Sequence, residues 1–175
     1  MSSAAPGEFE KLVRAHAGLV ARIASTYERR PALIEELVQE VFLAVYNAFP
    51  AYRGEASLRT FIARIAHNVC VDHVRRAARK PREVDVSLAA DVADHASDQE
   101  NETDLALKRE QLVRAVRGLD LPLRQVIGLH LEGFSNLEIA EILSLSPGNV
   151  GVRIHRARTT LEKMITKTLP QTVAS

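Results

Sequence analysis

Residues 135–158, SNLEIAEILSLSPGNVGVRIHRAR, hold the pattern that decides the fold of the second half of the chain. Ser135, with Glu138 three residues later, forms a capping box, in which the serine hydroxyl caps a helix and the glutamate reaches back to the cap backbone. Ser146-Pro147 then starts another helix, because serine caps helices and proline is favoured in their first turn. The segment therefore predicts a short helix, a tight turn and a longer helix.

The longer of these two helices carries a basic face. Arg153, Arg156 and Arg158 project from it, whereas Leu145 and Val150 fix the turn and the helix to a core. A guanidinium group can pair with two acceptors on guanine or clamp a phosphate. A short helix, a turn and an arginine-rich helix are typical of the DNA-binding helix-turn-helix. The alternative is a solvated basic helix in an ordinary helical bundle.

Two more helices are predicted before this motif. The range 105–119 is amphipathic, and Pro122 opens a further apolar helix that ends at Gly133. Four helices over residues 105–170 therefore predict one compact domain that contains the helix-turn-helix.

The first half of the chain predicts three helices, because its apolar residues recur at three- and four-residue steps. The first helix carries this periodicity from Phe9 to Tyr27. The second begins at Pro31, which suits a first turn, and stops at Pro50.

A loop and a basic helix complete the first half. Residues 50–56 form the loop, in which Gly54 is available for an unusual turn. Ser57 caps the third helix, which Pro81 closes. Residues 1–80 therefore predict an N-terminal helical domain.

The net charge of +1 hides an uneven distribution of charge. Two basic blocks, at residues 53–80 and 153–167, flank an acidic one, and residues 83–104 contain no Lys or Arg. Local charge attracts phosphate, so the basic blocks favour a nucleic-acid partner. The acidic block has too few large apolar side chains to offset the entropy of ordering. The sequence thus predicts an all-α protein whose two small helical domains are joined by a flexible acidic linker, residues 81–104.

Composition argues against several other classes of protein. Cys70 is the only cysteine, so it forms no intrachain disulfide, and we expect a buried thiol. No apolar run is long enough to cross a bilayer, and residues 1–7 lack the order of a secretory signal, so we expect a cytoplasmic protein. Neither a phosphate loop nor a Ser/His/Asp pattern appears, and we expect no cofactor and no enzymatic activity.

Several sequence motifs in the second half resemble those of a known family, the extracytoplasmic-function (ECF) sigma factors of bacterial RNA polymerase. EIAEIL at residues 138–143, followed by RIHRAR at 153–158, resembles the domain of that family that binds the promoter −35 element. LPLRQ at 121–125 resembles the motif at the start of this domain.

The first half extends the resemblance in the order of the family. ELVQEVF at residues 36–42 resembles its polymerase-binding helix. RGEASLRTF at 53–61, followed by IAHN at 65–68, resembles its promoter-melting segment. The resemblance implies a transcription initiation factor that binds core polymerase, recognises −35 and −10 elements and assists DNA melting. It implies as partners the largest-subunit coiled coil and the flap of polymerase, promoter DNA and, as a candidate, an anti-sigma protein.

The resemblance assigns polymerase binding to the second helix, at Glu36, Leu37, Gln39 and Glu40. Acidic and amide groups there would meet a basic partner and fix register. Leu37 either supplies an apolar anchor or packs inside. The alternative for Glu36 and Glu40 is a plain solvated face, and Glu36 replaces the Asp usual in the family.

The resemblance assigns the −10 element to the loop and the third helix. A flexible loop with polar edges can form a pocket for a base taken out of its stack. The side chains expected to contact DNA, either at base edges or at the backbone, are Tyr52, Arg53, Ser57, Arg64, His67, Asn68, Arg75, Arg76 and Arg79. Phe61, where the family usually has Trp, falls on the apolar stripe and is expected in the core.

The resemblance assigns the −35 element to the last helix, at Asn149, Gly151, Val152, Arg153, His155, Arg156 and Arg158. Gly151 and Val152 depart from the basic and small polar residues usual at these positions. Glycine also costs about 1 kcal/mol of helix stability relative to alanine. We therefore expect fewer direct side-chain contacts at −35 and more reliance on DNA shape.

Two other functions are weighed against this one. A stand-alone helix-turn-helix regulator would use the first domain for dimerisation or sensing, but such a domain needs no basic third helix. A helical carboxylate metal enzyme would use Glu36 and Glu40 with His16 or His67, but the Glu-x-x-His pairs of such sites are absent.

Overall fold

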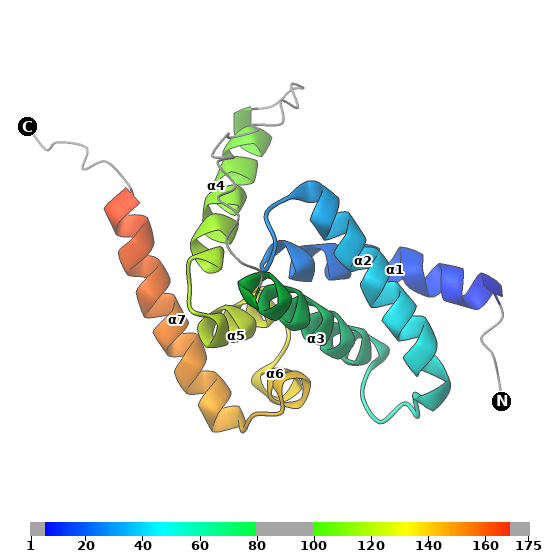
Figure 1. Cartoon of the computed structure of the whole chain (residues 1–175). Coiled ribbons are helices and arrows are strands. Elements are labelled where there is room, and N and C mark those ends of the chain that lie inside the picture. The colour runs from blue at the N-terminus through cyan, green and yellow to red at the C-terminus, as the bar shows by residue number, and fades with distance from the viewer. Residues whose placement is uncertain (1–5, 80–99, 169–175) are drawn as a thin grey trace, which may run out of the picture.

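The computed structural model describes residues 6–79 and 100–168, which form two groups of helices (Figure 1). The first lobe consists of α1 (Pro6–Ser25), α2 (Pro31–Ala48), the short 3-10 helix η1 (Phe49–Ala51) and α3 (Leu58–Arg79). The second lobe consists of α4 (Glu100–Arg117), α5 (Leu121–Leu131), α6 (Asn136–Leu143) and α7 (Pro147–Thr168). These two described ranges contain no strand, and the predicted all-helical fold is confirmed.

The core of the first lobe is built where α1, α2 and α3 pack against one another. Val20, Val41, Ile62 and Cys70 are fully buried there. Cys70 is therefore the buried thiol that the sequence predicted, and its burial, with the nearby Glu40 charge, raises the pKa of the thiol to about 12.

A buried carboxylate ties the turn between α1 and α2 to α3. Glu28 accepts hydrogen bonds from the backbone N–H groups of Arg29 and Arg30, from the Arg30 side chain, and it contacts Nε2 of His73 at 2.9 Å. Burial alone would raise the pKa of Glu28, but the bonds from Arg30 and His73 outweigh it and lower the pKa to about 2. The contact between Glu28 and His73 therefore helps to fix the position of α3.

In the second lobe, Val116, Val126, Ile139 and Val150 are each at most 1% exposed, and they belong to the same hydrophobic cluster as the core of the first lobe. The first helix of the second lobe, α4, begins at Glu100, five residues before the domain boundary expected at 105. Residues 80–99, most of the predicted linker, lie outside the described residues.

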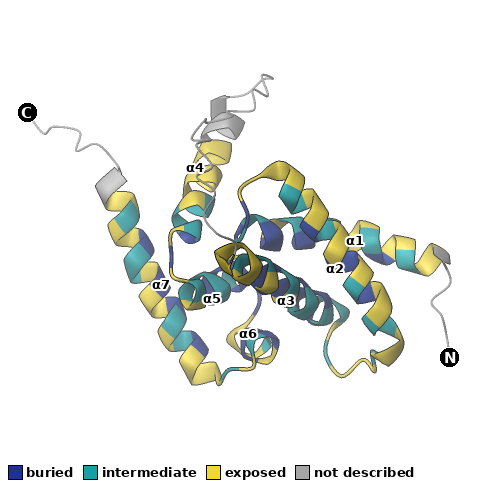
Figure 2. Ribbon diagram, viewed as in Figure 1, coloured by how far each residue is buried: buried dark blue, intermediate teal, exposed yellow. Residues whose placement is uncertain are grey.

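The two lobes are in contact, with α6 lying against α3 (Figure 1). Figure 2 shows that the buried stretches of the ribbon lie on the inward sides of the helices, whereas exposed residues follow the outer sides of α4 and α7. No helix among the described residues is long and apolar enough to span a membrane.

Candidate nucleic-acid interface

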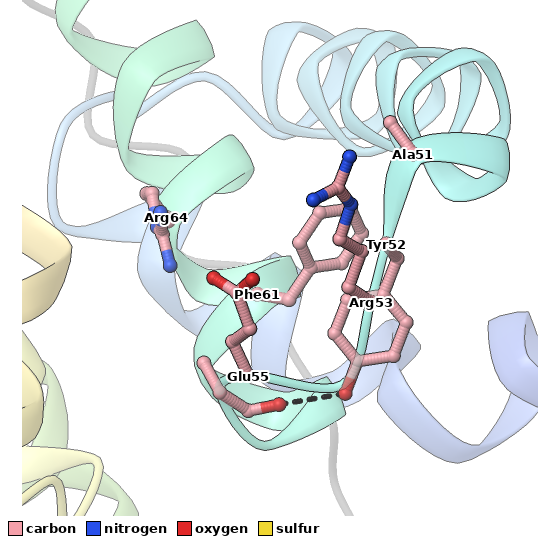
Figure 3. A pocket seen from close by; sticks show the side chains of 7 residues that line it. Ala51, Tyr52, Arg53, Glu55, Phe61 and Arg64 are labelled. Atoms are coloured by element: carbon pink, nitrogen blue, oxygen red, sulfur yellow. Dashed lines mark hydrogen bonds between the residues drawn. The ribbon is translucent and has the colours of Figure 1, made fainter.

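A hollow of about 400 Å³ lies between the loop after α2 and the start of α3 (Figure 3). Its lining consists of Ala51, Tyr52, Arg53, Glu55, Ala56, Phe61 and Arg64. The rings of Tyr52 and Phe61 lie 4.7 Å apart, and the Tyr52 hydroxyl donates a 2.7 Å hydrogen bond to the Ala56 carbonyl across the loop. Aromatic surface beside charged groups is the combination on which an unstacked base binds.

The α3 end of this loop is fixed by a helix cap. The Ser57 hydroxyl accepts a hydrogen bond from the Thr60 backbone N–H at 3.1 Å and shares another with the Thr60 hydroxyl at 2.9 Å. Ser57 is thus the cap that the sequence predicted. Phe61 is half-buried and packs against the core, as expected, but it also forms a wall of the hollow.

The basic face of α3 is exposed along its second half. Asn68, Arg75, Arg76 and Arg79 all reach solvent. Arg75 lies 3.6 Å from Asp72, and Arg76 lies 3.3 Å from Glu40 of α2. These side chains form a surface that can follow a phosphate backbone.

His67 differs from its neighbours, because it is buried at 7% exposure. Its Nδ1 is 3.1 Å from the Tyr27 hydroxyl, and burial, aided by the Arg75 charge, lowers its pKa to about 4. The ring thus joins α3 to the end of α1 and is not presented at the surface where we expected it to meet a base. Helical spacing places residues 67 and 68 on adjacent faces, and only Asn68 is exposed.

The helix-turn-helix is present with the predicted caps. The Ser135 hydroxyl accepts from the Glu138 backbone N–H at 3.2 Å, and the Glu138 carboxylate accepts from the Ser135 N–H at 2.8 Å. These hydrogen bonds from Ser135 lower the pKa of Glu138. At the next helix, the Ser146 hydroxyl accepts from the Asn149 N–H at 3.3 Å.

The turn between α6 and α7 uses a left-handed residue. Ser144 ends α6 with φ 54° and ψ 46°, and its N–H bonds back to the carbonyls of Ala140 and Glu141. Val150, which is fully buried, then anchors the first turn of α7 in the core. The orientation of α7 is therefore fixed from both ends of the turn.

The outer face of α7 presents most of the residues expected at the −35 element. Asn149, Val152, His155 and Arg156 are exposed, whereas Arg153 is half-buried. Arg158 is exposed and donates to Nε2 of His130 in α5 at 2.7 Å. A β-carbon added at Gly151 would meet only the Asn136 side chain, at 3.9 Å, so this face has open space.

Helix α2 presents a second, separate surface. Glu36, Gln39 and Glu40 are exposed as expected, but Leu37 is only 2% exposed and packs inside, which is the second of its two predicted alternatives. Leu43 and Tyr46, which were not among the predicted residues, are 63% and 48% exposed on the same helix. Their helical spacing from residues 36, 39 and 40 is the signal that places them on the same side of α2.

A third surface, also missed, is apolar and lies on the second lobe. Leu105 and Leu107 of α4 are 66% and 52% exposed, and Ile165 of α7 is 38% exposed. An open hollow of about 470 Å³ on α4 is lined mainly by apolar surface, including Leu105 and Val113. The hollow lined by Leu105 and Val113 gathers exposed apolar surface, which is a mark of a protein-binding surface, whereas Leu107 and Ile165 lie outside it. Nowhere in the described part of the chain do three His, Cys, Asp or Glu side chains gather as a metal site requires.

Two family models match the chain, and each covers one lobe. The model of sigma-70 region 2 matches residues 12–80, and that of sigma-70, region 4 matches residues 109–161. The ECF RNA polymerase sigma-E factor of Haemophilus influenzae is 34% identical over an alignment of 167 residues that covers 90% of this chain and 87% of that protein. The ECF RNA polymerase sigma-E factor of Escherichia coli (strain K12) is 31% identical, over 75% of this chain and 73% of that protein.

Two solved structures have the same arrangement of helices. CnrH, solved with the cytosolic domain of CnrY, has a TM-score of 0.68 and 24% identity, and the match covers 95% of this chain and 93% of that one. RpoE of Bartonella quintana, solved with the anti-sigma factor NepR, has a TM-score of 0.72 and 19% identity over 93% of this chain and 99% of that one. At these identities the likeness bears on the fold.

Proposed function

The chain belongs to the ECF sigma factors, alternative sigma factors that direct RNA polymerase to promoters, and from this premise we propose which of its surfaces meets each partner. The family is not enzymatic, so every role is one of binding. The observation that carries the proposal is the separation of three surfaces: the outer face of α2, the loop hollow before α3, and the outer face of α7. A factor that binds polymerase and two promoter elements at once needs several exposed surfaces on different elements, and those of α2 and α3 adjoin where Arg76 meets Glu40.

Helix α2 docks on the coiled coil of the largest subunit of core polymerase. Its exposed face combines Glu36, Gln39 and Glu40 with the apolar side chains of Leu43 and Tyr46. Apolar anchors supply affinity and charges around them fix register, which suits a basic coiled-coil partner.

The apolar hollow on α4 docks on the flap of core polymerase. Leu105 and Val113 line it, and burying such side chains against a partner stabilises a complex. Docking by both lobes would hold the two DNA-binding surfaces at a fixed separation.

The loop hollow captures a base of the −10 element when the duplex opens. The Tyr52 and Phe61 rings offer stacking surface, and Arg53 and Arg64 lie where phosphate or base edges would be held. Asn68 and the arginines at 75, 76 and 79 continue this surface along α3. His67 acts from inside, by holding α3 against Tyr27.

Helix α7 lies in the major groove of the −35 element. Arg156 and His155 are exposed, and their side chains contact the edges of bases. Asn149 lies near the start of the helix, and the exposed Arg158 contacts the DNA backbone. Because Val152 and Gly151 bring neither charge nor hydrogen-bonding side chain, readout depends partly on DNA shape.

An anti-sigma protein is a further proposed partner, and the factor acts in the cytoplasm, where its polymerase is. This proposal is supported by RpoE of Bartonella quintana, which shares this fold and was solved in complex with the anti-sigma factor NepR.

Run-off transcription with purified core polymerase and a promoter library tests the proposal. We expect discrete transcripts that require this chain, and promoters that share −35 and −10 elements. Specific binding of promoter duplex without polymerase, together with no transcripts, would instead favour the stand-alone regulator.

A further inference from the structure

A hydrogen bond joins the end of α5 to the outer face of α7, which lies beside it (Figure 1). The Nη2 group of Arg158 donates to Nε2 of His130 at 2.7 Å. Because a guanidinium group has no acceptor, the imidazole accepts, and the neutral ring therefore carries its proton on Nδ1. This contact occupies one N–H of Arg158 and leaves the other donors of the guanidinium group for a further partner.

The end of α5 lies on the flank of the face of α7 that we assign to DNA. Arg158 is two turns after Gly151 on the same side of α7, about 10 Å further along the helix axis. At Gly151, a β-carbon would lie 3.9 Å from the Asn136 side chain in the first turn of α6. At Arg158, the neighbour is His130 near the end of α5. A duplex on this face of α7 would therefore meet both the start of α6 and the end of α5.

The His130 ring is half-buried, whereas Arg158 is exposed. Burial lowers the pKa of His130, and the positive charge of Arg158 lowers it further. The ring is therefore poised as a neutral acceptor in the free chain. Negative charge brought close to it would reverse this balance and favour the imidazolium form.

The other charged side chains around the end of α5 have partners elsewhere. On the helices packed against α5, these contacts hold Arg114 to Glu110, Arg117 to the Ser25 carbonyl, Glu138 to Ser135 and Glu141 to Arg64. On α5 itself, they hold Arg124 to the Leu119 carbonyl and Glu132 to Arg22. On α7, His155 and Glu162 are exposed about one turn before and one turn after Arg158. The charge that acts on the His130 ring is that of Arg158.

We propose that His130 and Arg158 together bind one backbone phosphate of duplex DNA, and that the imidazole takes up a proton from solvent when the phosphate binds. This inference rests on the proposed placement of α7 on the −35 element. Once Nε2 carries a proton, the ring no longer accepts from Arg158, and both side chains donate to the same phosphate. The phosphate lies between two positive charges and offsets their repulsion. A residue of α5, outside the helix-turn-helix, thus becomes part of the DNA-binding surface.

Proton uptake makes the affinity for duplex DNA depend on pH. The phosphate charge raises the pKa of His130 above its lowered value in the free chain. Affinity therefore increases as pH falls through the pKa of the bound state, and it levels off below the pKa of the free chain. His67 does not contribute near neutral pH, because its pKa is about 4.

The test measures binding of the full chain to a random-sequence duplex, at constant ionic strength, at pH values of about 7.5 and about 6. A random sequence suffices because phosphate contacts carry no sequence information. His130→Gln keeps an acceptor for Arg158 but cannot titrate. His16→Gln is the matched control, because it removes another half-buried histidine, on α1 of the first lobe. His130→Lys places a permanent positive charge at the end of α5.

Between the higher and the lower pH, the affinities of wild type and His16→Gln should rise about fivefold more than that of His130→Gln. At the higher pH, His130→Lys should bind about fivefold more tightly than His130→Gln, because its charge needs no proton uptake. A second readout is the imidazole NMR signal that His130→Gln lacks. We expect this signal to titrate at higher pH when the duplex is present.

The same pH dependence in wild type and His130→Gln would overturn the proposal and leave the assignment of α7 to DNA standing. Loss of the pH dependence in His155→Gln but not in His130→Gln would do the same, as would a His130 titration that the duplex does not move. No gain from His130→Lys over His130→Gln would also count against the shared phosphate. If Arg156→Ala binds the duplex as tightly as wild type, the assignment of α7 to DNA fails, and this inference fails with it.

Discussion

The Arg76 guanidinium of α3 lies 3.3 Å from the Glu40 carboxylate of α2. This ion pair joins a residue proposed to hold promoter DNA to a residue proposed to hold polymerase. Both side chains are at least half exposed, so the pair adds little to stability but places the two charges side by side. Its exposure allows the docking role of Glu40 to be tested apart from the fold.

Exchange of the two charges, Glu40→Arg with Arg76→Glu, should keep the ion pair and the fold but place a positive charge on the docking face. We expect at least about tenfold weaker competition for core polymerase, because a basic coiled coil would repel this charge. The competition assay uses labelled wild-type chain and no DNA. The matched control is Glu10→Arg with Arg14→Glu on α1, another exposed pair. Normal competition by the exchanged variant would show that Glu40 does not dock on polymerase.

His67 should make the stability of the first lobe depend on pH. Its pKa is about 4 in the folded chain, below the ordinary value of 6.5, so the neutral ring favours folding. The stabilisation is complete above pH 6.5 and is lost as pH falls through 6.5 towards 4. From pH 7 to pH 5, we expect a loss of about 2 kcal/mol in the free energy of unfolding from this group.

Urea unfolding at both pH values, with wild type and His67→Gln, measures this contribution. The variant should be less stable at pH 7 but should lose about 2 kcal/mol less than wild type on acidification. An identical pH dependence in the two proteins would mean that the ring is charged, or reaches solvent, in the folded chain.

Local signals in the sequence were enough to predict the helices. Caps and prolines act within one turn, so Ser57, Ser135 and Pro147 begin helices where their neighbours predict them. Burial is different, because it depends on what packs against a residue. His67 sits inside because α3 packs against the chain just after α1, where the Tyr27 hydroxyl meets the ring, and a polar residue type gives no sign of this in its own helix.

The polar contacts between the two lobes could not be predicted for a related reason. Arg22 and Glu132 are 110 residues apart, and each alone looks like an ordinary surface charge. Only the packing of α5 and α6 on the first lobe brings them together. The exposed apolar side chains, Leu43 and Leu105 among them, could be placed on helices but not on a surface for the same reason.

Ser144 should limit the stability of the helix-turn-helix. Its φ of 54° is in the left-handed region, which costs residues with a β-carbon about 1 kcal/mol or more. Ser144→Gly should therefore stabilise the second lobe by about 0.5–1 kcal/mol, after allowance for the greater freedom of glycine in the unfolded chain. Urea unfolding measures this gain. Ser144→Ala keeps the β-carbon and should show none, and an equal gain in both would assign the effect to loss of the hydroxyl.

Gly151 offers the sharpest test of how α7 reads the −35 element. A side chain at this position meets only Asn136, at 3.9 Å, so lysine should fit without disturbing the lobe. Replacing glycine within a helix should also stabilise it by about 1 kcal/mol. Gly151→Lys should therefore bind duplex DNA more tightly and with a steeper dependence on salt, because one more phosphate contact releases more counterions.

Two further variants separate the causes of this gain. Gly151→Ala stabilises the helix without adding charge, so its affinity should lie between wild type and Gly151→Lys. Gly7→Lys adds the same charge at an open position on α1 and should leave duplex binding nearly unchanged. Affinities for a promoter duplex and a random duplex, each over a range of salt, complete the measurement. If both substitutions at 151 weaken binding, the missing β-carbon itself is what matters, because the α7 backbone then approaches the DNA too closely to admit a side chain.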